Sequence, residues 1–193
     1  MAEINFNIAL QPKQKEAFKL SLEFPVFAFG GAKGGGKSFF VRARELYRRL
    51  QYPFSTGCII RQTYGELWDN HIRQFFIEYP ELKTWYSAER KTIEYPNGSV
   101  TQFIYLRNEK DALVYQGRSY DDISFDEATQ HPYESFAMMS SCNRLSNPKL
   151  QNKIKPSMIL TCNPGGIGHD WVKRLFIDRN FNDGDYSDRK SVV

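Results

Sequence analysis

The sequence of 193 residues predicts an α/β fold, with a mostly parallel central sheet and helices on both of its faces. Short apolar runs alternate along the chain with segments whose apolar residues recur every three or four positions, as strands and amphipathic helices do. A Pro-Asn-Gly turn between two strand-like segments adds a β-hairpin. The composition is 41% hydrophobic and 25% charged, which supplies an ordinary core and excludes disorder and low-complexity repeats.

In the first half of the chain we expect a short helix at 12–22, a buried strand at 26–29 and, after a glycine-rich loop, a helix at 39–50. Four arginines stand between the apolar positions of the second helix and predict a basic outer face: Arg42, Arg44, Arg48 and Arg49. Residues 11–50 carry nine Lys or Arg and three Asp or Glu. This local excess of positive charge suits an anionic partner, nucleotide phosphate or nucleic acid, although a solvated helix face has the same composition.

The second half continues the alternation and ends in a polar segment. We expect strands at 58–60, 123–125 and 158–160, helices at 64–79 and 133–143, and hairpin strands at 92–95 and 99–106 around Asn97-Gly98. From Asn180 onward nothing resembles a packed element. We therefore expect one domain over residues 1–179 and a tail or linker over 180–193.

Several classes of protein are excluded by composition. No apolar run approaches the roughly 20 residues that a membrane-spanning helix needs, and no secretory signal is visible, so we expect a soluble intracellular protein that does not associate with a membrane. The three cysteines, Cys58, Cys142 and Cys162, form no Cys-x-x-Cys pair and predict reduced thiols. The three histidines match no zinc-binding spacing.

The glycine-rich loop carries the first chemical motif. It fits the phosphate-binding pattern G-x-x-x-x-G-K-[ST] in full, with Gly31, Ala32, Lys33, Gly34, Gly35, Gly36, Lys37 and Ser38. Glycines let backbone N–H groups converge on phosphate oxygens, and the following helix presents its positive N-terminus to the same charge. We expect Lys37 to reach the β- and γ-phosphates of a nucleotide and the Ser38 hydroxyl to bind Mg²⁺.

Two strand ends supply the other candidate residues. Asp126 follows the apolar strand at 123–125, at the sheet edge where a carboxylate is placed to bind Mg²⁺. Glu127 is the candidate base that activates the attacking water. Thr161 and Asn163 follow the last predicted strand and are candidates for contacting the γ-phosphate, although a Pro-Gly turn explains them equally well.

The sequence also indicates which nucleotide is bound and whether it is hydrolysed. No N-K-x-D guanine motif is present, which argues against a GTPase. Gln11 and Gln14 precede the first strand, and a glutamine amide can pair with N6 and N7 of adenine, which favours ATP. A helicase core domain of the same fold is an alternative, as is a module that binds ATP without hydrolysing it. Glu127 argues against such a module, because a pure switch needs no water-activating base.

As an ordered set, these residues resemble the ATPase domain of the large terminase subunit, the DNA-packaging motor of tailed bacteriophages. The segments that carry the resemblance, besides the phosphate-binding loop, are Pro12-Lys13-Gln14, Ile60-Arg61-Gln62-Thr63-Tyr64 with Leu67, Pro96-Asn97-Gly98-Ser99 with Phe103, Tyr115 through Ala128, and Thr161-Cys162-Asn163-Pro164. The resemblance covers about residues 10–175 and implies a RecA-like (ASCE) P-loop NTPase fold with a β-hairpin insertion. It makes Gln14 the adenine-contacting glutamine, and Thr161 and Asn163 the residues that couple hydrolysis to movement.

The resemblance further implies a function. ATP hydrolysis with Mg²⁺ would power translocation of double-stranded viral DNA into a procapsid, in the host cytoplasm during virion assembly. The subunits would associate into a ring at the portal, with the small terminase subunit and the portal protein as partners. The family also carries a C-terminal RNase H-like nuclease, which this chain is too short to hold, so we expect no nuclease activity.

Two positions depart from the family pattern. Lys33 stands where many relatives have arginine, and it keeps the positive charge but loses the planar bidentate fork. Many relatives also have an arginine before the glycine that corresponds to Gly117, whereas here the arginine follows that glycine. Arg118 is therefore our candidate for an arginine that acts on a neighbouring subunit's site, with Arg61 and Arg107 as alternatives.

Overall fold

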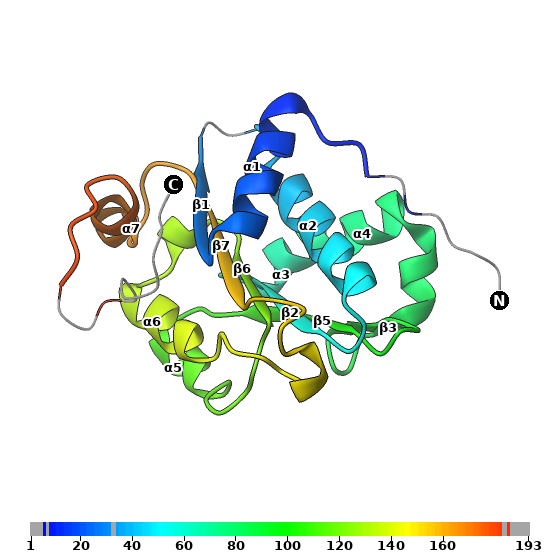
Figure 1. Ribbon diagram of the computed structural model, residues 1–193. Coiled ribbons are helices and arrows are strands. Elements are labelled where there is room, and N and C mark those ends of the chain that lie inside the picture. The colour runs from blue at the N-terminus through cyan, green and yellow to red at the C-terminus, as the bar shows by residue number, and fades with distance from the viewer. Residues whose placement is uncertain (1–5, 7, 32–33, 183–184, 186–193) are drawn as a thin grey trace.

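A seven-stranded sheet in the order β1-β7-β6-β2-β5-β4-β3 lies at the centre of the computed structural model (Figure 1). The structure describes residues 6, 8–31, 34–182 and 185. The strands are β1 (Val26–Gly30), β2 (Thr56–Arg61), β3 (Tyr86–Ser87), β4 (Thr92–Glu94), β5 (Val100–Tyr105), β6 (Asp122–Phe125) and β7 (Ser157–Cys162). β1, β7, β6, β2 and β5 run parallel, while β4 pairs antiparallel with β5 and β3 with β4. The predicted mostly parallel sheet is confirmed.

Helices cover both faces of this sheet, with α1, α2 and α4 on one face and α5 and α6 on the other (Figure 1). The α-helices are α1 (Pro12–Glu23), α2 (Lys37–Gln51), α3 (Tyr64–Leu67), α4 (Arg73–Glu78), α5 (Glu109–Leu113), α6 (Tyr133–Ser141) and α7 (His169–Phe176). A π-helical segment, Trp68–Ile72, joins α3 to α4, and 3-10 turns occupy Pro80–Trp85, Ala128–Gln130 and Pro148–Leu150. The four predicted helices are confirmed, and the structure adds α5 and α7. None of the helices in the described ranges has the length and apolar character that crossing a membrane requires.

The alternation of side chains along the strands divides the core into two layers. On β7, Met158 and Leu160 belong to the layer that contains α5, α6 and α7, whereas Ile159 belongs to the layer that contains α1 and α2. Strands that are apolar on both faces are expected in a parallel sheet covered by helices on both sides. The three cysteines are free thiols, as predicted, and Cys58 and Cys142 are buried.

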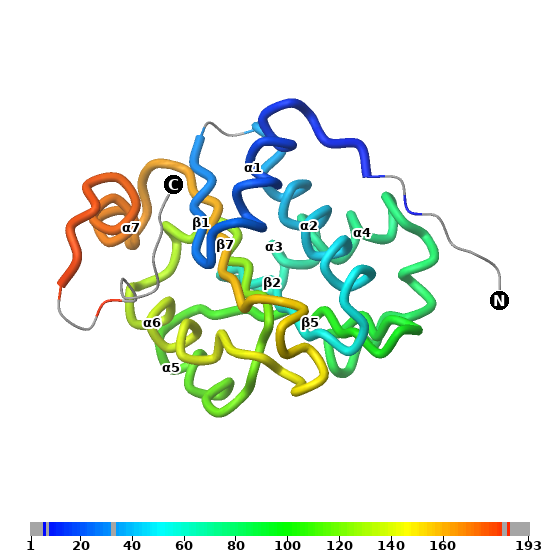
Figure 2. Tube along the Cα trace, in the orientation of Figure 1, coloured from blue at the N-terminus to red at the C-terminus, as the bar shows by residue number. Residues whose placement is uncertain are grey.

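The register of the sheet brings the ends of four parallel strands to one edge. Gly30 at the end of β1 lies opposite Cys162 of β7, and Phe125 at the end of β6 lies opposite both Leu160 of β7 and Ile60 of β2. Figure 2 shows β1 and β7, far apart in the sequence, side by side. The phosphate-binding loop, the acidic pair after β6 and the polar residues after β7 are therefore neighbours at this edge.

The predicted hairpin is present and is part of the central sheet. β4 and β5 pair antiparallel on either side of Asn97-Gly98, where Ser99 donates its backbone N–H to the Asn97 side chain at 3.0 Å. β5 also pairs in parallel with β2 along its whole length. The hairpin thus extends one side of the sheet.

The predicted basic outer face of α2 is wrong, because all four of its arginines are buried. α2 lies between α1 and α4 in Figure 1, so both of its flanks are covered. Arg42 forms an ion pair with Glu78 of α4, and the other three arginines reach Asp122 at the start of β6. At these four positions the positive charge serves internal ion pairs and is not presented to an external anion.

Five buried side chains form what we call the anchor cluster: Arg44, Glu45, Arg48, Arg49 and Asp122. Arg44 and Arg48 lie 3.5 and 2.9 Å from Asp122, which Arg49 also contacts. Arg49 lies 3.4 Å from Glu45, and a Cβ atom at Gly57 would collide with the Glu45 carboxylate. Burial alone would raise the pKa of Asp122, but the three arginines outweigh it and hold that pKa well below its usual range. The cluster ties the C-terminal half of α2 to the start of the strands.

One residue beyond Asn180 is packed, contrary to the expectation for this segment. Asp185 is buried, and it accepts a hydrogen bond from the Tyr133 hydroxyl at 2.5 Å. It also forms an ion pair with Arg174 of α7 at 2.5 Å. The hydrogen bonds from Arg174 and Tyr133 hold the pKa of Asp185 below its usual range, despite partial burial. This contact fixes the chain after α7 against α6.

Candidate nucleotide-binding site

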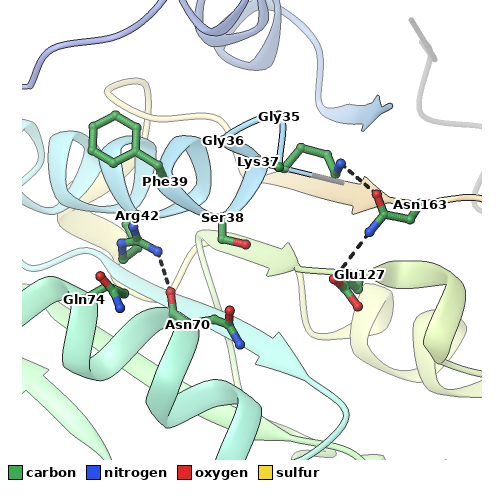
Figure 3. A pocket seen from close by; sticks show the side chains of 11 residues that line it. Gly35, Gly36, Lys37, Ser38, Phe39, Arg42, Asn70, Gln74, Glu127 and Asn163 are labelled. Carbon is green, nitrogen blue, oxygen red and sulfur yellow. Dashed lines mark hydrogen bonds between the residues drawn. The ribbon is translucent and has the colours of Figure 1, made fainter. Parts of the chain in front are cut away.

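A cavity of about 580 Å³ opens at the sheet edge where the glycine-rich loop enters α2. It is lined by Gly34, Gly35, Gly36, Lys37, Ser38, Phe39, Arg42, Asn70, Gln74, Glu127 and Asn163. Its volume is that of a small-molecule site. Figure 3 shows Lys37, Asn163 and Glu127 together on one side of this cavity, with Ser38 between them and Arg42. The structure therefore brings together candidate residues from three separate segments of the sequence.

Lys37 begins α2 and lies among oxygen acceptors. Its Nζ donates to the backbone oxygen of Gly31 at 3.0 Å and to Asn163 Oδ1 at 2.8 Å. The first N–H groups of a helix have no intrahelical acceptors, and the positive end of the helix dipole adds to their attraction for an anion. The start of α2 therefore has the donors and the charge that suit a phosphate. Ala32 and Lys33 of the predicted loop lie outside the described residues.

Gln14 lies behind the loop rather than in the cavity. Its Nε2 donates to the backbone oxygen of Gly36 at 3.0 Å, and its Oε1 accepts from the backbone N–H of Gln11 at 2.9 Å. Gly36 has a φ of +70°, and a Cβ atom there would collide with the Gln14 amide. Gln14 is 3% exposed and is not among the described residues that line the cavity. Its visible effect is to position the last glycine before α2.

Asp126 is buried and accepts hydrogen bonds at both carboxylate oxygens. Oδ2 accepts from Ser38 Oγ at 2.9 Å, from Arg61 at 2.5 Å and from His71 Nε2 at 2.8 Å. Oδ1 accepts from Thr161 Oγ1 at 2.5 Å. Burial alone would raise the pKa of Asp126, but these contacts, that with His71 first, hold it far below its usual range. Burial lowers the pKa of His71, and the adjacent Asp126 carboxylate opposes this effect.

Ser38 and Asp126 together suit a Mg²⁺ ion. Magnesium prefers oxygen ligands, retains several of its waters and is bound in nucleotide sites by one or two protein groups together with phosphate oxygens. The Ser38 hydroxyl lines the cavity, and Asp126 is the charged oxygen donor directly behind it. The donor set therefore fits the ion that the sequence predicts, with Ser38 in front and Asp126 adjacent.

Glu127 has a left-handed backbone conformation, with φ +60° and ψ +55°, which costs a residue with a side chain about 1–3 kcal/mol. Its backbone N–H donates to Thr161 Oγ1 at 3.1 Å. One carboxylate oxygen lies 3.4 Å from Asn163 Nδ2, and the other accepts from Gln130 Nε2. This turn aims the carboxylate at the cavity, where Figure 3 shows it beside Asn163. The placement suits a base that takes a proton from water.

The two candidates after β7 take different positions. Asn163 lines the cavity between Lys37 and Glu127, and its amide contacts both. Thr161 is buried behind it and contacts the acidic pair, not the cavity. Asn163 is thus placed to meet a phosphate, while Thr161 holds the two carboxylate residues in place.

Of the three candidate arginines, one is buried and two are exposed. Arg61 is buried and contacts Asp126, and its NH2 lies 3.5 Å from Glu127. Arg107 follows β5 at the same edge and is exposed. Arg118 is exposed on the loop before β6, with its guanidinium 5.2 Å from the ring centre of Tyr115, and is not among the described residues that line the cavity.

Two residues of the site have no signal in the sequence. His71 sits in a helical apolar pattern, which is more typical of a core position than of a site. It lies on the π-helical segment, and such segments are frequent at functional sites. Gln130 follows Glu127 by three residues, and only the 3-10 turn at 128–130 brings its amide back to the Glu127 carboxylate.

The fold and the cavity define the class of protein. A phosphate-binding loop follows β1, an acidic pair follows β6, and β7 lies between these two strands, as in RecA-like P-loop NTPases. The chain belongs to the family of terminase large-subunit N-terminal domains, because residues 28–192 match the family described as "Terminase large subunit, T4likevirus-type, N-terminal". The predicted family and fold are confirmed.

Solved structures support the same fold. The large terminase of bacteriophage HK97 aligns with a TM-score of 0.60 at 12% identity, over 89% of this chain and 38% of that one. The large terminase of a thermophilic bacteriophage, in complex with ATP-gamma-S, aligns with a TM-score of 0.64 at 16% identity, over 88% and 41%. The ATPase domain of the Thermus phage P74-26 large terminase aligns with a TM-score of 0.60 at 16% identity, over 87% and 69%. This chain thus spans about two fifths of the first two of these terminases. No curated protein sequence matches it.

Proposed function

We propose that this chain hydrolyses ATP to power the movement of double-stranded viral DNA into a procapsid. Membership of the terminase family supports the packaging role. The observation that carries hydrolysis is the convergence of Lys37, Ser38 and Glu127 on one cavity, with Asp126 directly behind Ser38. The large terminase of the thermophilic bacteriophage was solved with ATP-gamma-S, which supports an adenine nucleotide as the ligand here.

Each residue at the cavity has a separate role in phosphoryl transfer. Backbone N–H groups of the loop and the Lys37 ammonium bind the phosphate chain. Ser38 and Asp126 would hold Mg²⁺, which would neutralise charge on the phosphate oxygens. Glu127 orients a water and accepts its proton. Asn163, which contacts both Lys37 and Glu127, meets the γ-phosphate and transmits its loss to the rest of the domain.

We further propose that several subunits act together. Arg118 is exposed and therefore accessible to a neighbouring subunit, as Arg107 also is, whereas Arg61 is buried within its own subunit. A ring at the portal would place Arg118 beside the neighbour's γ-phosphate, where a cation stabilises the charge that develops during transfer. The portal protein and the small terminase subunit are the proposed partners, in the host cytoplasm. Residues 1–179 would form the ATPase domain, against which Asp185 of the following segment packs.

The decisive experiment measures ATP turnover per subunit across a wide range of protein concentration, with and without Mg²⁺. Glu127→Gln should lower kcat by about 10²- to 10⁴-fold and leave ATP binding intact, because it removes the base but keeps the shape of the side chain. Turnover that rises with concentration and is lost in Arg118→Ala would support an arginine supplied by a neighbour. If Glu127→Gln hydrolyses ATP as fast as the wild type, Glu127 is not the base.

A further inference from the structure

The helical stretch between β2 and β3 contains one turn that is not α-helical. In the π-helical segment Trp68–Ile72, the backbone N–H of Arg73 donates to the backbone oxygen of Trp68, five residues earlier. Residues four apart share a face of an α-helix, whereas residues five apart share a face of a π-helical turn. Such turns are rare and are frequently found at functional sites, so we asked what this one positions.

The π-helical turn decides which of two neighbouring residues faces the apolar core. Leu67 and Ile72, five residues apart, both belong to the core layer that contains α1 and α2. His71, four residues after Leu67, is equally buried, but its Nε2 lies 2.8 Å from Asp126 Oδ2. With uniform α-helical geometry, His71 would take the place of Ile72 beneath Leu67. The turn therefore directs the imidazole to the carboxylate and keeps isoleucine in the core.

Arg42 of α2 holds this turn from outside the helix. Its Nη1 donates to the backbone oxygen of Asn70, as the dashed line in Figure 3 shows. Its Nε donates to Glu78 Oε2 at 2.9 Å, and its Nη2 donates to the other carboxylate oxygen of Glu78. A buried guanidinium with a bidentate carboxylate partner has a defined orientation. Arg42 therefore joins the π-helical segment to α4 on one side and to α2 on the other.

Two side-chain amides bind further backbone oxygens of the same stretch. Asn70 Nδ2 donates to the backbone oxygen of Glu66 at 2.8 Å, and Gln74 Nε2 donates to that of Asp69 at 3.2 Å. A π-helical turn interrupts the regular ladder of α-helical hydrogen bonds, and backbone oxygens need donors. These amides and Arg42 supply them, which stabilises the turn in the conformation that presents His71.

We propose that His71 is a positioning residue for the Mg²⁺ site and that Arg42 acts through His71 by holding the π-helical turn. The inference rests on the proposed function, because it takes Asp126 to lie beside the ion. Asp126 Oδ2 also accepts from Ser38 and Arg61, and an ionised carboxylate only accepts, so His71 Nε2 supplies the hydrogen that joins them. Hydrogen-bond partners of this kind orient metal-binding carboxylates, and their loss typically weakens metal binding about 10- to 100-fold.

The test separates the contribution of the ion from that of the nucleotide. Calorimetric titration gives dissociation constants for ATP-gamma-S in EDTA and in Mg²⁺, and the ratio of the first to the second measures what the ion adds to nucleotide binding. His71→Leu should lower this ratio about tenfold or more and leave the value in EDTA unchanged. His71→Gln, whose Nε2 can take the place of the ring nitrogen, should restore most of the ratio.

Two further variants complete this series. His131→Leu replaces another buried histidine, which packs on Phe125, and is the matched control that should leave the ratio unchanged. If His71→Leu does not fold, His71→Asn takes its place, because its amide is too short to reach Asp126 and should lower the ratio as well.

A double-mutant cycle tests the role of Arg42. Arg42→Met should lower the same ratio in the wild-type background. In the His71→Leu background it should have no further effect, because Arg42 is proposed to act only through the imidazole. Non-additive losses of this kind are the signature of residues that act through one another.

Each contrary outcome has a separate meaning. An unchanged ratio in His71→Leu would overturn the inference, and so would a higher ratio, which would mean that His71 competes with the ion. A loss in His71→Gln as large as that in His71→Leu would leave His71 with a packing role only. Additive losses in the double variant would overturn the role of Arg42. Wild-type protein that binds ATP-gamma-S equally well in Mg²⁺ and EDTA, or not at all, would overturn the proposed function itself.

Discussion

The two ends of β6 carry two buried aspartates with similar partners and different surroundings. Asp122 begins the strand and is enclosed by three arginines of α2 in the anchor cluster. Asp126 follows the strand and is held by Arg61 and His71, but Ser38 connects it to an open cavity. Both carboxyls have a pKa held far below its usual range by their partners. A depressed pKa alone therefore does not identify a functional carboxylate, and contact with a ligand-sized cavity distinguishes the two.

The largest expected effect on stability lies at the start of β6, where Asp122 is enclosed by the anchor cluster. Asp122→Ala leaves three buried arginines without their shared carboxylate and should lower the free energy of unfolding by about 3–5 kcal/mol. Denaturant titration measures it. The control is Glu94→Ala, which removes an exposed partner of Arg90 and should cost at most about 1 kcal/mol. A loss below about 1 kcal/mol for Asp122→Ala would mean that the anchor cluster does not stabilise the domain.

At the other end of β6, beside the cavity, an alanine substitution should weaken nucleotide binding rather than stability. Lys37→Ala removes charge-assisted hydrogen bonds to phosphate, each worth about 1.5–3 kcal/mol, so the dissociation constant for ATP should rise at least about tenfold. The free energy of unfolding should change far less than in Asp122→Ala. Calorimetric titration checks the first point, with the exposed Lys13→Ala as control. An unchanged affinity would place the phosphates elsewhere.

The free energy of unfolding should also depend on pH, through His131. Burial lowers the pKa of His131 to about 4, with Arg61 adding to the effect, whereas an unfolded histidine titrates near 6.5. Between these two values the unfolded state binds the extra proton, so stability is lost as the pH falls from about 6.5 toward 4. At pH 5 this amounts to about 2 kcal/mol.

Replacing His131 by Phe should therefore reduce the difference in unfolding free energy between pH 7 and pH 5 by about 2 kcal/mol. Denaturant titrations at the two pH values measure it. His169→Asn is the control, since that side chain is only partly buried on α7. Equal pH dependence in wild type and His131→Phe would show that His131 is protonated as readily in the folded protein as in the unfolded one.

The smallest expected effect concerns Gln130, whose amide positions the carboxylate of Glu127, the proposed base. Gln130→Met keeps the length of the side chain but removes the amide that donates to Glu127, so kcat should fall about tenfold with KM for ATP unchanged. Gln62→Met, which removes a bond to the backbone oxygen of Gln130, should have a weaker effect of the same kind. A matched rise in KM would instead indicate that Gln130 shapes the nucleotide site.

Most of the fold, and the candidate residues that the structure brings together at the cavity, could be predicted, because both depend on local patterns. Strands and helices follow from apolar periodicity, and the loop that ends in Lys37-Ser38 follows from its glycines. The Asp126-Glu127 pair was found because it follows an apolar strand. His71 and Gln130 could not be found, since their roles arise from a contact between segments far apart in the sequence and from a single turn.

The sequence by itself determined the order of the elements, the class of fold and the residues that we propose to meet phosphate. The tertiary structure decided that Arg44, Arg48 and Arg49 face Asp122 rather than water, and that Gln14 lies behind the loop. The physical reason is that periodicity shows which residues of a helix share a face, but burial depends on what packs against that face. Other elements pack against both flanks of α2, so its arginines are buried and form ion pairs with Asp122 inside the protein.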